Sequence, residues 1–262
     1  MHASRYERRY FTFSDGVLMT AVWNDDVLES YTAHRSNGPV GAVEPFLRDL
    51  AGRGFNPKHI LDVGANVGNW SKSASLVFPA AKISMVEPQH SLTDSLNELC
   101  QELPQARLFP VAAGAEASRR ELFLRAEDPS STFCDVGEYG EPLGVQSTEI
   151  IPLDSLLDLP DFPGPDLVKI DVEGFEMEVF KGAQKIISTA EMLVVEVSFF
   201  KWYPMTPRFV DVITYLDERG LDVYDFCWFL RRPLDGALGI SDVCFVRRDS
   251  PLRANHRWAA AE

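Results

Sequence analysis

The sequence of 262 residues lacks any apolar run close to the ~20 residues that a membrane-spanning helix requires. Its N-terminus also lacks the hydrophobic segment of a secretory signal peptide, because Arg5, Arg8 and Arg9 interrupt its first ten residues. We therefore expect a globular protein of the cytoplasm that has no membrane span.

Cysteine is scarce and dispersed. The chain has four, namely Cys100, Cys134, Cys227 and Cys244, and no two of them form a CxxC pair. This number lies far below the cysteine density of a secreted disulfide scaffold. We predict reduced thiols that are buried in the fold.

The chain also has fewer basic than acidic residues. Aspartate and glutamate number 39 against 25 lysines and arginines, which gives a formal net charge of -14, and the basic residues form no run. Such a chain repels a phosphate backbone. We predict no nucleic-acid partner.

What the chain does contain is enough apolar sequence, 45% of its residues, to form the core of one large domain. From Ile60 onward, short β-rich runs alternate with amphipathic stretches of helical length, which predicts an α/β fold with a mostly parallel sheet. The predicted strands are Ile60–Val63, Lys82–Val86, Ala106–Ala112, Leu167–Asp171 and Met192–Val197, followed by Leu221–Phe229 and Val243–Arg247 as a closing antiparallel hairpin. The predicted helices are Asn69–Val77, Ser91–Glu102, Phe175–Ile187 and Pro207–Arg219.

The domain organisation predicted from these elements has three parts. Residues 1–45 form an N-terminal extension or cap, with a hairpin within Arg9–Trp23 and a helix at Val43–Arg53 that leads into the first core strand. Residues 46–249 form the main domain, and residues 250–262 form a tail. The stretch Ala126–Glu149 is rich in glycine, proline and serine, and it is predicted to be a long functional loop.

A glycine turn follows the first core strand directly. The segment Asp62-Val63-Gly64-Ala65-Asn66-Val67-Gly68 departs from the G-x-G-x-x-G of pyrophosphate-binding turns, because it has the pattern D-x-G-x-x-x-G, which opens on an acidic residue. Two glycines allow the backbone to approach a ligand closely, and a carboxylate in this place suits a cationic group such as an α-ammonium. The turn thus disfavours a nicotinamide-dependent oxidoreductase.

Two further strand ends agree with a nucleoside ligand. Glu87 ends the second strand, where an acidic side chain can accept hydrogen bonds from both hydroxyls of a ribose. Ala112 and Ala113 end the third, and small residues leave room there for an adenine. A nucleoside that carries an amino-acid arm is S-adenosylmethionine.

These motifs, taken together, resemble those of a known protein family. The motifs Ile60–Gly68, Val86-Glu87-Pro88 and Val168-Lys169-Ile170-Asp171-Val172-Glu173-Gly174 together are similar to those of the FkbM methyltransferases. The resemblance implies a seven-stranded class I (Rossmann-like) methyltransferase fold and methylation of a hydroxyl on a sugar, glycoside or polyketide-type natural product. It also implies that Asp62, Gly64 and Gly68, with Asn66 in the same turn, hold the methionyl end of the cofactor, that Glu87 holds the ribose, and that the turn at residues 169–174 lines the reaction centre.

Charged residues gather where the acceptor would react. Lys169, Asp171 and Glu173 alternate along the end of the fourth strand, and ligands of open α/β sheets bind beyond the carboxyl ends of the strands. Asp171 is the preferred base or metal ligand, with Glu173 as its alternate and Lys169 as its charge partner. Glu196 ends the next strand, so Asp171 and Glu196 could share a Mg²⁺ ion. The alternative is an internal salt-bridge cluster around Lys169.

The acceptor itself is less readable from the sequence. Contacts are expected from the cap, from Ser130-Ser131-Thr132 and from the aromatic segment Phe199–Tyr203, although hydrophobic closure of the sheet explains the last segment equally well. Structural roles are expected for His34, His59 and His90. A nitrogen or carboxylate acceptor, or a binding scaffold without turnover, remain the alternatives.

Overall fold

The computed structural model describes residues 8–12, 18–22, 43–125, 131–133, 142–202 and 204–257. The chain divides into two compact units, Met1–Val40 and Gly41–Glu262. In the first unit, strands β1 (Arg8–Thr12) and β2 (Leu18–Val22) pair in antiparallel fashion. This pairing confirms the hairpin predicted in the N-terminal extension.

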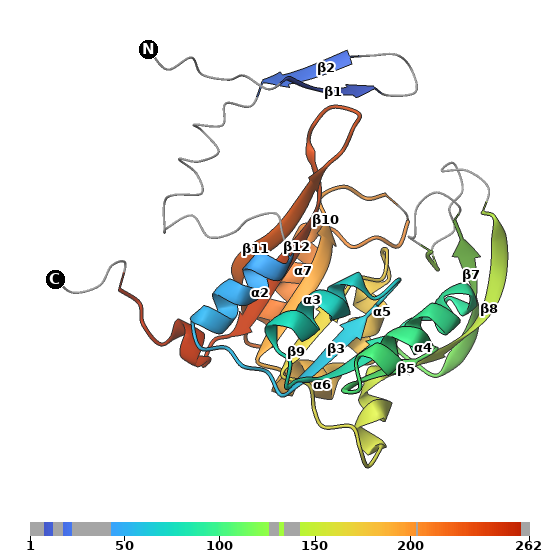
Figure 1. Cartoon of the computed structure of the whole chain (residues 1–262), viewed down its shortest axis with the longest axis vertical. Helices are drawn as coiled ribbons and strands as arrows, with labels where there is room; N and C mark the ends of the chain where they lie inside the picture. The colour runs from blue at the N-terminus through green and yellow to red at the C-terminus, as the bar shows by residue number, and fades with distance from the viewer. Residues whose placement is uncertain are drawn as a thin grey trace. The chain divides into compact units, whose positions relative to one another are not determined.

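The second unit is built on a seven-stranded sheet (Figure 1). Its order is β11-β12-β10-β9-β3-β4-β5. The strands are β3 (His59–Val63), β4 (Lys82–Val86), β5 (Ala106–Phe109), β9 (Leu167–Ile170), β10 (Met192–Ser198), β11 (Leu221–Arg231) and β12 (Leu238–Arg247). The pairs among β5, β4, β3, β9 and β10 are parallel, whereas β12 runs antiparallel to both of its neighbours. The predicted α/β class, with seven strands and a terminal hairpin, is confirmed.

The strand order reverses beside β3. From β3 the chain continues outward to β4 and β5, and it then returns to place β9 on the opposite side of β3. Crossover connections that diverge in this way leave a crevice at the carboxyl ends of the two strands. The order therefore places a binding crevice where β3 and β9 end.

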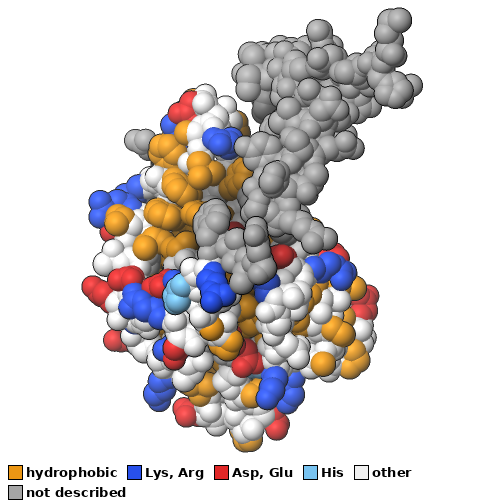
Figure 2. Space-filling model, turned by 90° about the vertical axis from the view of Figure 1, so that its left-hand side faces the viewer, with side chains coloured by type: hydrophobic (Ala, Val, Ile, Leu, Met, Phe, Trp, Pro, Cys, Tyr) orange, Lys and Arg blue, Asp and Glu red, His pale blue; other side chains and the backbone are white. Residues whose placement is uncertain are grey.

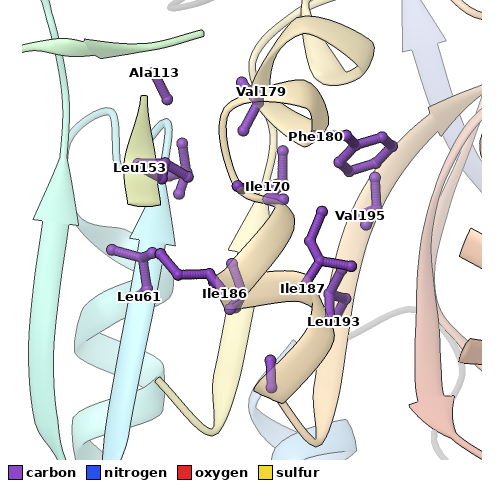
Figure 3. Close-up of a cluster of buried hydrophobic side chains, with 14 of the residues drawn as sticks. Leu61, Ala113, Leu153, Ile170, Val179, Phe180, Ile186, Ile187, Leu193 and Val195 are labelled. Carbon is purple, nitrogen blue, oxygen red and sulfur yellow. The ribbon is translucent and has the colours of Figure 1, made fainter. Parts of the chain in front are cut away.

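Helices cover both faces of this sheet. On one face lie α2 (Val43–Gly52), α3 (Asn69–Val77) and α4 (Thr93–Glu102), which contribute Leu47, Trp70 and Leu96 to one buried cluster. On the other lie α5 (Glu176–Lys181), α6 (Gln184–Thr189) and α7 (Phe209–Asp217), which belong to a second cluster. Figure 3 shows part of that second cluster, in which Val179, Phe180, Ile186 and Ile187 lie near Leu61, Ile170, Leu193 and Val195 of the strands.

The helix predicted over Phe175–Ile187 is divided in two by Gly182. A Cβ atom at this glycine would lie 1.9 Å from the carbonyl oxygen of Gly114, so only glycine fits at the contact. The chain therefore breaks between α5 and α6 to accommodate a backbone that is remote in sequence. This long-range cause explains why helical periodicity did not reveal the break.

A second, three-stranded sheet has the order β6-β8-β7, with β6 (Ala112–Ala113), β7 (Ser118–Leu124) and β8 (Gly144–Ile151). The predicted strand Ala106–Ala112 thus ends at Phe109, and Ala112 belongs to this other sheet. The predicted loop Ala126–Glu149 is wrong over its last part, which forms β8. Strand β7 was missed because only Leu122 of its seven residues is buried, so the sequence shows no regular alternation.

The remaining expectations concern the chain's end and its thiols. Ser250 donates a hydrogen bond to Glu191 (2.8 Å), and Arg253 pairs with Asp222 (2.9 Å), so the predicted tail is attached to the domain at its start, while residues 258–262 lie outside the described part. Cys100, Cys227 and Cys244 are free thiols, as predicted, but only Cys227 and Cys244 of these three are buried, and Cys134 is not described. No helix among the described residues is long and apolar enough to cross a membrane.

Candidate functional site

The glycine turn between β3 and α3 touches the chain that follows β9. Gly64 has a φ of 77°, and a Cβ there would lie 1.8 Å from the carbonyl oxygen of Asp171. Gly68 has a φ of 80°, and a Cβ there would lie 2.4 Å from Cδ2 of Leu99. Both glycines are required by conformation and by contact, since other residues rarely adopt a positive φ.

Asp62 lies beneath this turn. It is fully buried, its Oδ2 accepts a hydrogen bond from Ser71 Oγ (2.6 Å), and its Oδ1 lies 3.5 Å from Lys169 Nζ. The carboxylate is absent from the described lining of the cleft that Gly64 borders. The structure thus gives Asp62 partners within the protein, and its predicted contact with an α-ammonium stays a prediction.

Glu87 forms part of the wall beside the turn. Its Oε2 accepts a hydrogen bond from the Asn66 amide (2.8 Å), and its Oε1 accepts one from the Gln89 amide (2.9 Å). Asn66 has a φ of 50°, and its own Oδ1 accepts a hydrogen bond from Val67 N (2.6 Å). Burial raises the pKa of Glu87 above its ordinary value, although these hydrogen bonds oppose the shift.

These elements surround a cleft that encloses about 580 Å³, its open mouth included. In open α/β sheets, ligands bind in such a crevice at the carboxyl ends of the strands. Five predicted cofactor residues lie on its wall, namely Gly64, Asn66, Glu87, Ala112 and Ala113. Asp171 and Glu173 line the same cleft, so the structure brings the predicted donor and acceptor regions together.

One apolar part of the wall was not found from the sequence. Leu122 of β7 and Phe133 line the cleft together with Phe175, whose ring centroid lies 5.1 Å from that of Phe133. These residues come from segments far apart in the chain, and no local pattern distinguishes them from ordinary core residues. Apolar and aromatic side chains of this kind suit a flat ring.

The segment Ser131–Phe133 joins two sides of the cleft. Ser131 Oγ donates a hydrogen bond to Gln89 Oε1 (2.9 Å), and Thr132 Oγ1 donates one to the carbonyl oxygen of Glu173 (2.8 Å). Ser131 also lines the cleft, while Ser130 lies outside the described residues. The predicted contact between this segment and an acceptor stays a prediction.

Lys169 connects the turn with the predicted reaction centre. Its side chain is 7% exposed, and Nζ donates a hydrogen bond to the Gly64 carbonyl oxygen (2.8 Å) and lies 3.1 Å from Asp171 Oδ2. Burial lowers the pKa of Lys169, but the charges of Asp171 and Asp62 outweigh burial, so the pKa is raised overall. Lys169 is therefore a charged ammonium group, as expected for the charge partner of Asp171.

Acidic side chains gather next to Lys169. One carboxylate oxygen from each of Asp171, Glu173 and Glu196 lies within 4.8 Å of the others, a spacing that could hold a metal ion. Burial, followed by the charges of Asp171 and Glu173, raises the pKa of Glu196 well above its ordinary value. The predicted acids are thus brought together.

Asp242 is a member of this group that the sequence did not identify as a site residue. It lies opposite Glu196 in the β10–β12 ladder. Burial and the charge of Asp171 raise the pKa of Asp242 to about 7. The signal was absent from the local sequence, because the partner of Asp242 depends on the register of two distant strands.

The turn after β9 aims Glu173 by an unusual backbone conformation. Glu173 has a φ of 53° and Gly174 a φ of 92°. The Gly174 amide donates a hydrogen bond to Glu176 Oε1 (3.0 Å), and burial raises the pKa of Glu176 to about 7. The turn thereby takes Glu173 out of the extended backbone of β9, so the alternation along the strand does not continue to this residue.

Histidines and the aromatic segment have structural contacts. His59 Nε2 lies 2.9 Å from Ser84 Oγ, and burial lowers the pKa of this histidine. His90 opens a short 3₁₀ turn, and its amide donates a hydrogen bond to Gln146. Phe199 stacks on Phe209 with a centroid distance of 4.9 Å, which favours hydrophobic closure. His34 and Tyr203 lie outside the described residues.

The sheet order, with a single antiparallel strand and a cleft at the strand reversal, defines a Rossmann-like fold of the class I methyltransferase type. Comparison with known sequences narrows this class. A model of the methyltransferase FkbM domain matches residues 62–223, and the chain belongs to the FkbM methyltransferase family.

A curated relative and two solved structures are similar to this chain. Hexuronic acid methyltransferase AglP of Haloferax volcanii is 27% identical over 136 residues, which are 52% of this chain and 54% of the relative, so the chain spans about half the length of this relative. A methyltransferase FkbM from Methylobacillus flagellatus KT has a TM-score of 0.47 at 16% identity, covering 71% of this chain and 43% of that one. N-methyltransferase NodS from Bradyrhizobium japonicum WM9, solved with S-adenosyl-L-homocysteine, has a TM-score of 0.47 at 10% identity and covers 78% and 85%.

Proposed function

We propose that this protein transfers a methyl group from S-adenosylmethionine to a hydroxyl oxygen of a sugar, glycoside or polyketide-type natural product. The observation that carries the proposal is the continuity of one cleft, in which Gly64 and Glu87 line one part and Asp171 and Glu173 another. A bisubstrate transfer requires such proximity, because the acceptor oxygen must be held roughly 3 Å from the methyl carbon. Family membership agrees with the same chemistry.

The proposed donor site uses the wall already described. Glu87 accepts hydrogen bonds from the ribose hydroxyls, and Ala112, Ala113, Leu122 and Phe133 pack around the adenine. The backbone of the glycine turn, which has no Cβ at Gly64, faces the methionyl part. Asp62 supports the turn through Ser71 and Lys169, and a direct contact with the α-ammonium is a separate prediction.

The donor supplies an electrophilic methyl carbon attached to a positively charged sulfur. The protein's own task is then to orient the hydroxyl and to remove its proton, since an alcohol is a weak nucleophile. As the oxygen–carbon bond forms and the carbon–sulfur bond breaks, the hydroxyl proton passes to a carboxylate. Asp171 suits this role because it lines the cleft beside Lys169, and Glu196, one of whose carboxylate oxygens lies within 4.8 Å of one from Asp171, is the alternative base.

A second way to activate the hydroxyl is a magnesium ion held by Asp171, Glu173 and Glu196. Their oxygens are close enough to coordinate one ion, and a cation there would relieve the charges of Asp171 and Glu173, which act together with burial to raise the pKa of Glu196. The ion would also orient the acceptor oxygen. This remains the second form of the proposal.

A carboxylate acceptor is the main alternative chemistry. The relative AglP is named for a hexuronic acid, which contains both hydroxyls and a carboxylate. A nitrogen acceptor and a scaffold without turnover are further alternatives, because the donor wall does not specify the nucleophile. We further expect that the protein acts on a small molecule in the cytoplasm. We expect no nucleic-acid partner.

Two measurements test the proposal. Calorimetry should detect binding of S-adenosylmethionine and S-adenosylhomocysteine, with weaker binding in Glu87→Gln. Labelled donor should then transfer its methyl group to hydroxyl acceptors in a panel of glycosides and macrolide-like alcohols, each assayed with and without EDTA. Absence of donor binding, together with no effect of Asp62→Ala, would reject the enzyme; indifference to EDTA would reject the magnesium form.

A further inference from the structure

Two residues other than glycine have a left-handed backbone in the described part of the chain, and both line the cleft. Asn66 has a φ of 50°, and Glu173 has a φ of 53°. Asparagine tolerates this conformation, whereas glutamate rarely adopts it. A conformation of this kind persists where the surrounding contacts fix it, and such residues gather at ligand sites. The contacts that hold Glu173 are therefore part of the architecture of the cleft.

One of these contacts comes from Thr132. This residue is fully buried, and its Oγ1 donates a hydrogen bond to the carbonyl oxygen of Glu173 (2.8 Å). Loss of a buried donor leaves its acceptor unsatisfied, so the bond fixes the direction of that peptide group. The same turn directs the Glu173 carboxylate, one oxygen of which lies within 4.8 Å of oxygens from Asp171 and Glu196. Thr132 thus acts on the proposed acceptor region from behind the wall of the cleft.

The segment that carries Thr132 is attached to the small sheet. Thr132 and Phe123 exchange two backbone hydrogen bonds, of 3.2 Å and 3.0 Å. On either side of Thr132, Ser131 and Phe133 line the cleft, as expected where successive side chains of an extended segment point in opposite directions. We call Ser131–Phe133 the bridging segment.

The bridging segment also contacts the proposed donor region. Ser131 Oγ donates a hydrogen bond to Gln89 Oε1 (2.9 Å), and the Gln89 amide donates one to Glu87 Oε1 (2.9 Å). Under the proposed function, Glu87 holds the ribose and Phe133 packs against the adenine. A continuous series of contacts therefore extends from the donor region, through the bridging segment, to the acceptor region.

We infer that Thr132 is a positioning residue, which holds Glu173 in place and couples occupation of the donor site to the order of the acceptor region. The inference rests on the proposed function and adds a coupling between its two substrates. A donor that restrains Phe133 also restrains the adjacent Thr132 hydroxyl, so less conformational freedom is left for the acceptor to remove. Such coupling is reciprocal, and a bound acceptor raises the affinity for the donor by the same factor.

Hydrogen–deuterium exchange of the whole chain tests the inference, with S-adenosylhomocysteine as the probe. The amides of residues 173–176 report on the turn, since the Gly174 amide donates to Glu176 Oε1. In the parent, the probe should slow their exchange about 5-fold or more. In Thr132→Val, which lacks the hydroxyl, exchange without the probe should be about 10-fold faster, and the effect of the probe should be lost.

Two further variants at this position separate the hydroxyl from the shape of the side chain. Thr132→Ser keeps the hydroxyl and should retain both the slow exchange and the effect of the probe. Thr132→Ala should behave like Thr132→Val, and it replaces that variant if the added methyl group prevents folding.

Thr189→Val is the matched control. The Thr189 hydroxyl also donates to a backbone carbonyl, that of Lys185 (3.1 Å), but it is exposed at the end of α6. This substitution should leave exchange in the turn unchanged, with and without the probe.

Calorimetry with S-adenosylhomocysteine on the same samples separates the two possible failures. A parent protein that does not bind the probe would reject the proposed function, and the inference with it. Binding that protects the turn equally in the parent and in Thr132→Val would overturn the inference alone, because the donor would then act on the turn directly. Binding that leaves the turn unprotected in the parent, or a Thr132→Ser variant that behaves like Thr132→Val, would overturn it as well.

Discussion

Lys169 Nζ lies 2.8 Å from the carbonyl oxygen of Gly64, a residue 105 positions earlier in the chain. The same ammonium group lies 3.1 Å from Asp171 Oδ2 and 3.5 Å from Asp62 Oδ1. One buried cation thereby connects the glycine turn after β3 with the acid after β9. The proposed donor and acceptor sites are thus held together by this side chain as well as by the pairing of β3 with β9.

Removal of the Lys169 ammonium group should lower the stability of the fold. Lys169→Met leaves Asp62 buried without its counter-ion, and breaking a buried pair in this way costs about 3–5 kcal/mol of unfolding free energy. The double variant Asp62→Asn with Lys169→Met should be more stable than Lys169→Met alone, because neither charge is then left unpaired. Urea denaturation measures both values. Additive losses in the double variant would contradict the coupling.

Gly64→Ala should lower stability and donor binding, more through the clash of the new Cβ with the Asp171 carbonyl oxygen than through backbone strain. Gly54 is a matched control, because it also has a positive φ (96°) but has nothing within 4 Å of a Cβ. Gly54→Ala should cost about 1–2 kcal/mol of stability, the usual cost of left-handed backbone. Gly64→Ala should cost more and should weaken donor binding at least 10-fold by calorimetry. Equal effects of the two substitutions would show that the approach to Asp171 does not matter.

Glu87→Gln should weaken donor binding by about 10- to 100-fold, since a hydrogen bond to a charged group contributes about 1.5–3 kcal/mol. The pKa of Glu87 is raised by burial, so donor affinity should decline as the pH falls toward that pKa and the carboxylate becomes protonated. Isothermal titration over a pH series measures the effect. In Glu87→Gln this decline should disappear, whereas Glu102→Gln, an exposed control, should retain it.

The stability of the fold should decrease as the pH rises from about 4 toward 7. The pKa of Asp242 in the folded protein is about 7, above its ordinary value, so the folded state holds a proton that the unfolded chain has released. The stabilisation is complete below the unfolded pKa and is lost as the pH rises through the folded one.

Asp242→Asn should remove this contribution. The variant should match the parent near pH 4 and should exceed it by about 1–2 kcal/mol at pH 8, a value reduced from the full shift because the side chain is only half-buried. Thermal denaturation across the pH range provides the measurement. A variant that is less stable than the parent at pH 8 would show that the ionised Asp242 is compensated by a partner.

The sequence predicted the elements whose determinants are local. Strands β3, β4 and β10 are buried apolar runs bounded by turns, and their ends agree closely with the predicted ones. The lining of the cleft was also predictable in part, because Gly64 and Glu87 directly follow such strands. Their chemistry is visible in short segments.

What remained hidden depends on contacts between distant segments. All five residues of β3 are buried, so the sequence shows no alternation of apolar and polar residues from which the face of the sheet that Asp62 occupies could be read. The partners of Asp62 in the structure are Ser71 and Lys169. Asp242 precedes an apolar run, and only the register of β12 against β10 reveals that it faces Glu196. Leu122 and Phe133 likewise reach the cleft from outside the main sheet.

Exposed apolar side chains gather on the edge strand β11, including Val223, Phe226, Phe229 and Leu230, and Figure 2 shows hydrophobic side chains crowded on this side of the molecule. The strand that separates β11 from the rest of the sheet is β12, which is synthesised last of the seven. Until β12 inserts, β10 has an open hydrogen-bonding edge and Glu196 lacks its neighbour Asp242. This edge is therefore open to pairing with other chains until the last strand is in place, which makes insertion of β12 a step of folding that is exposed to misassembly.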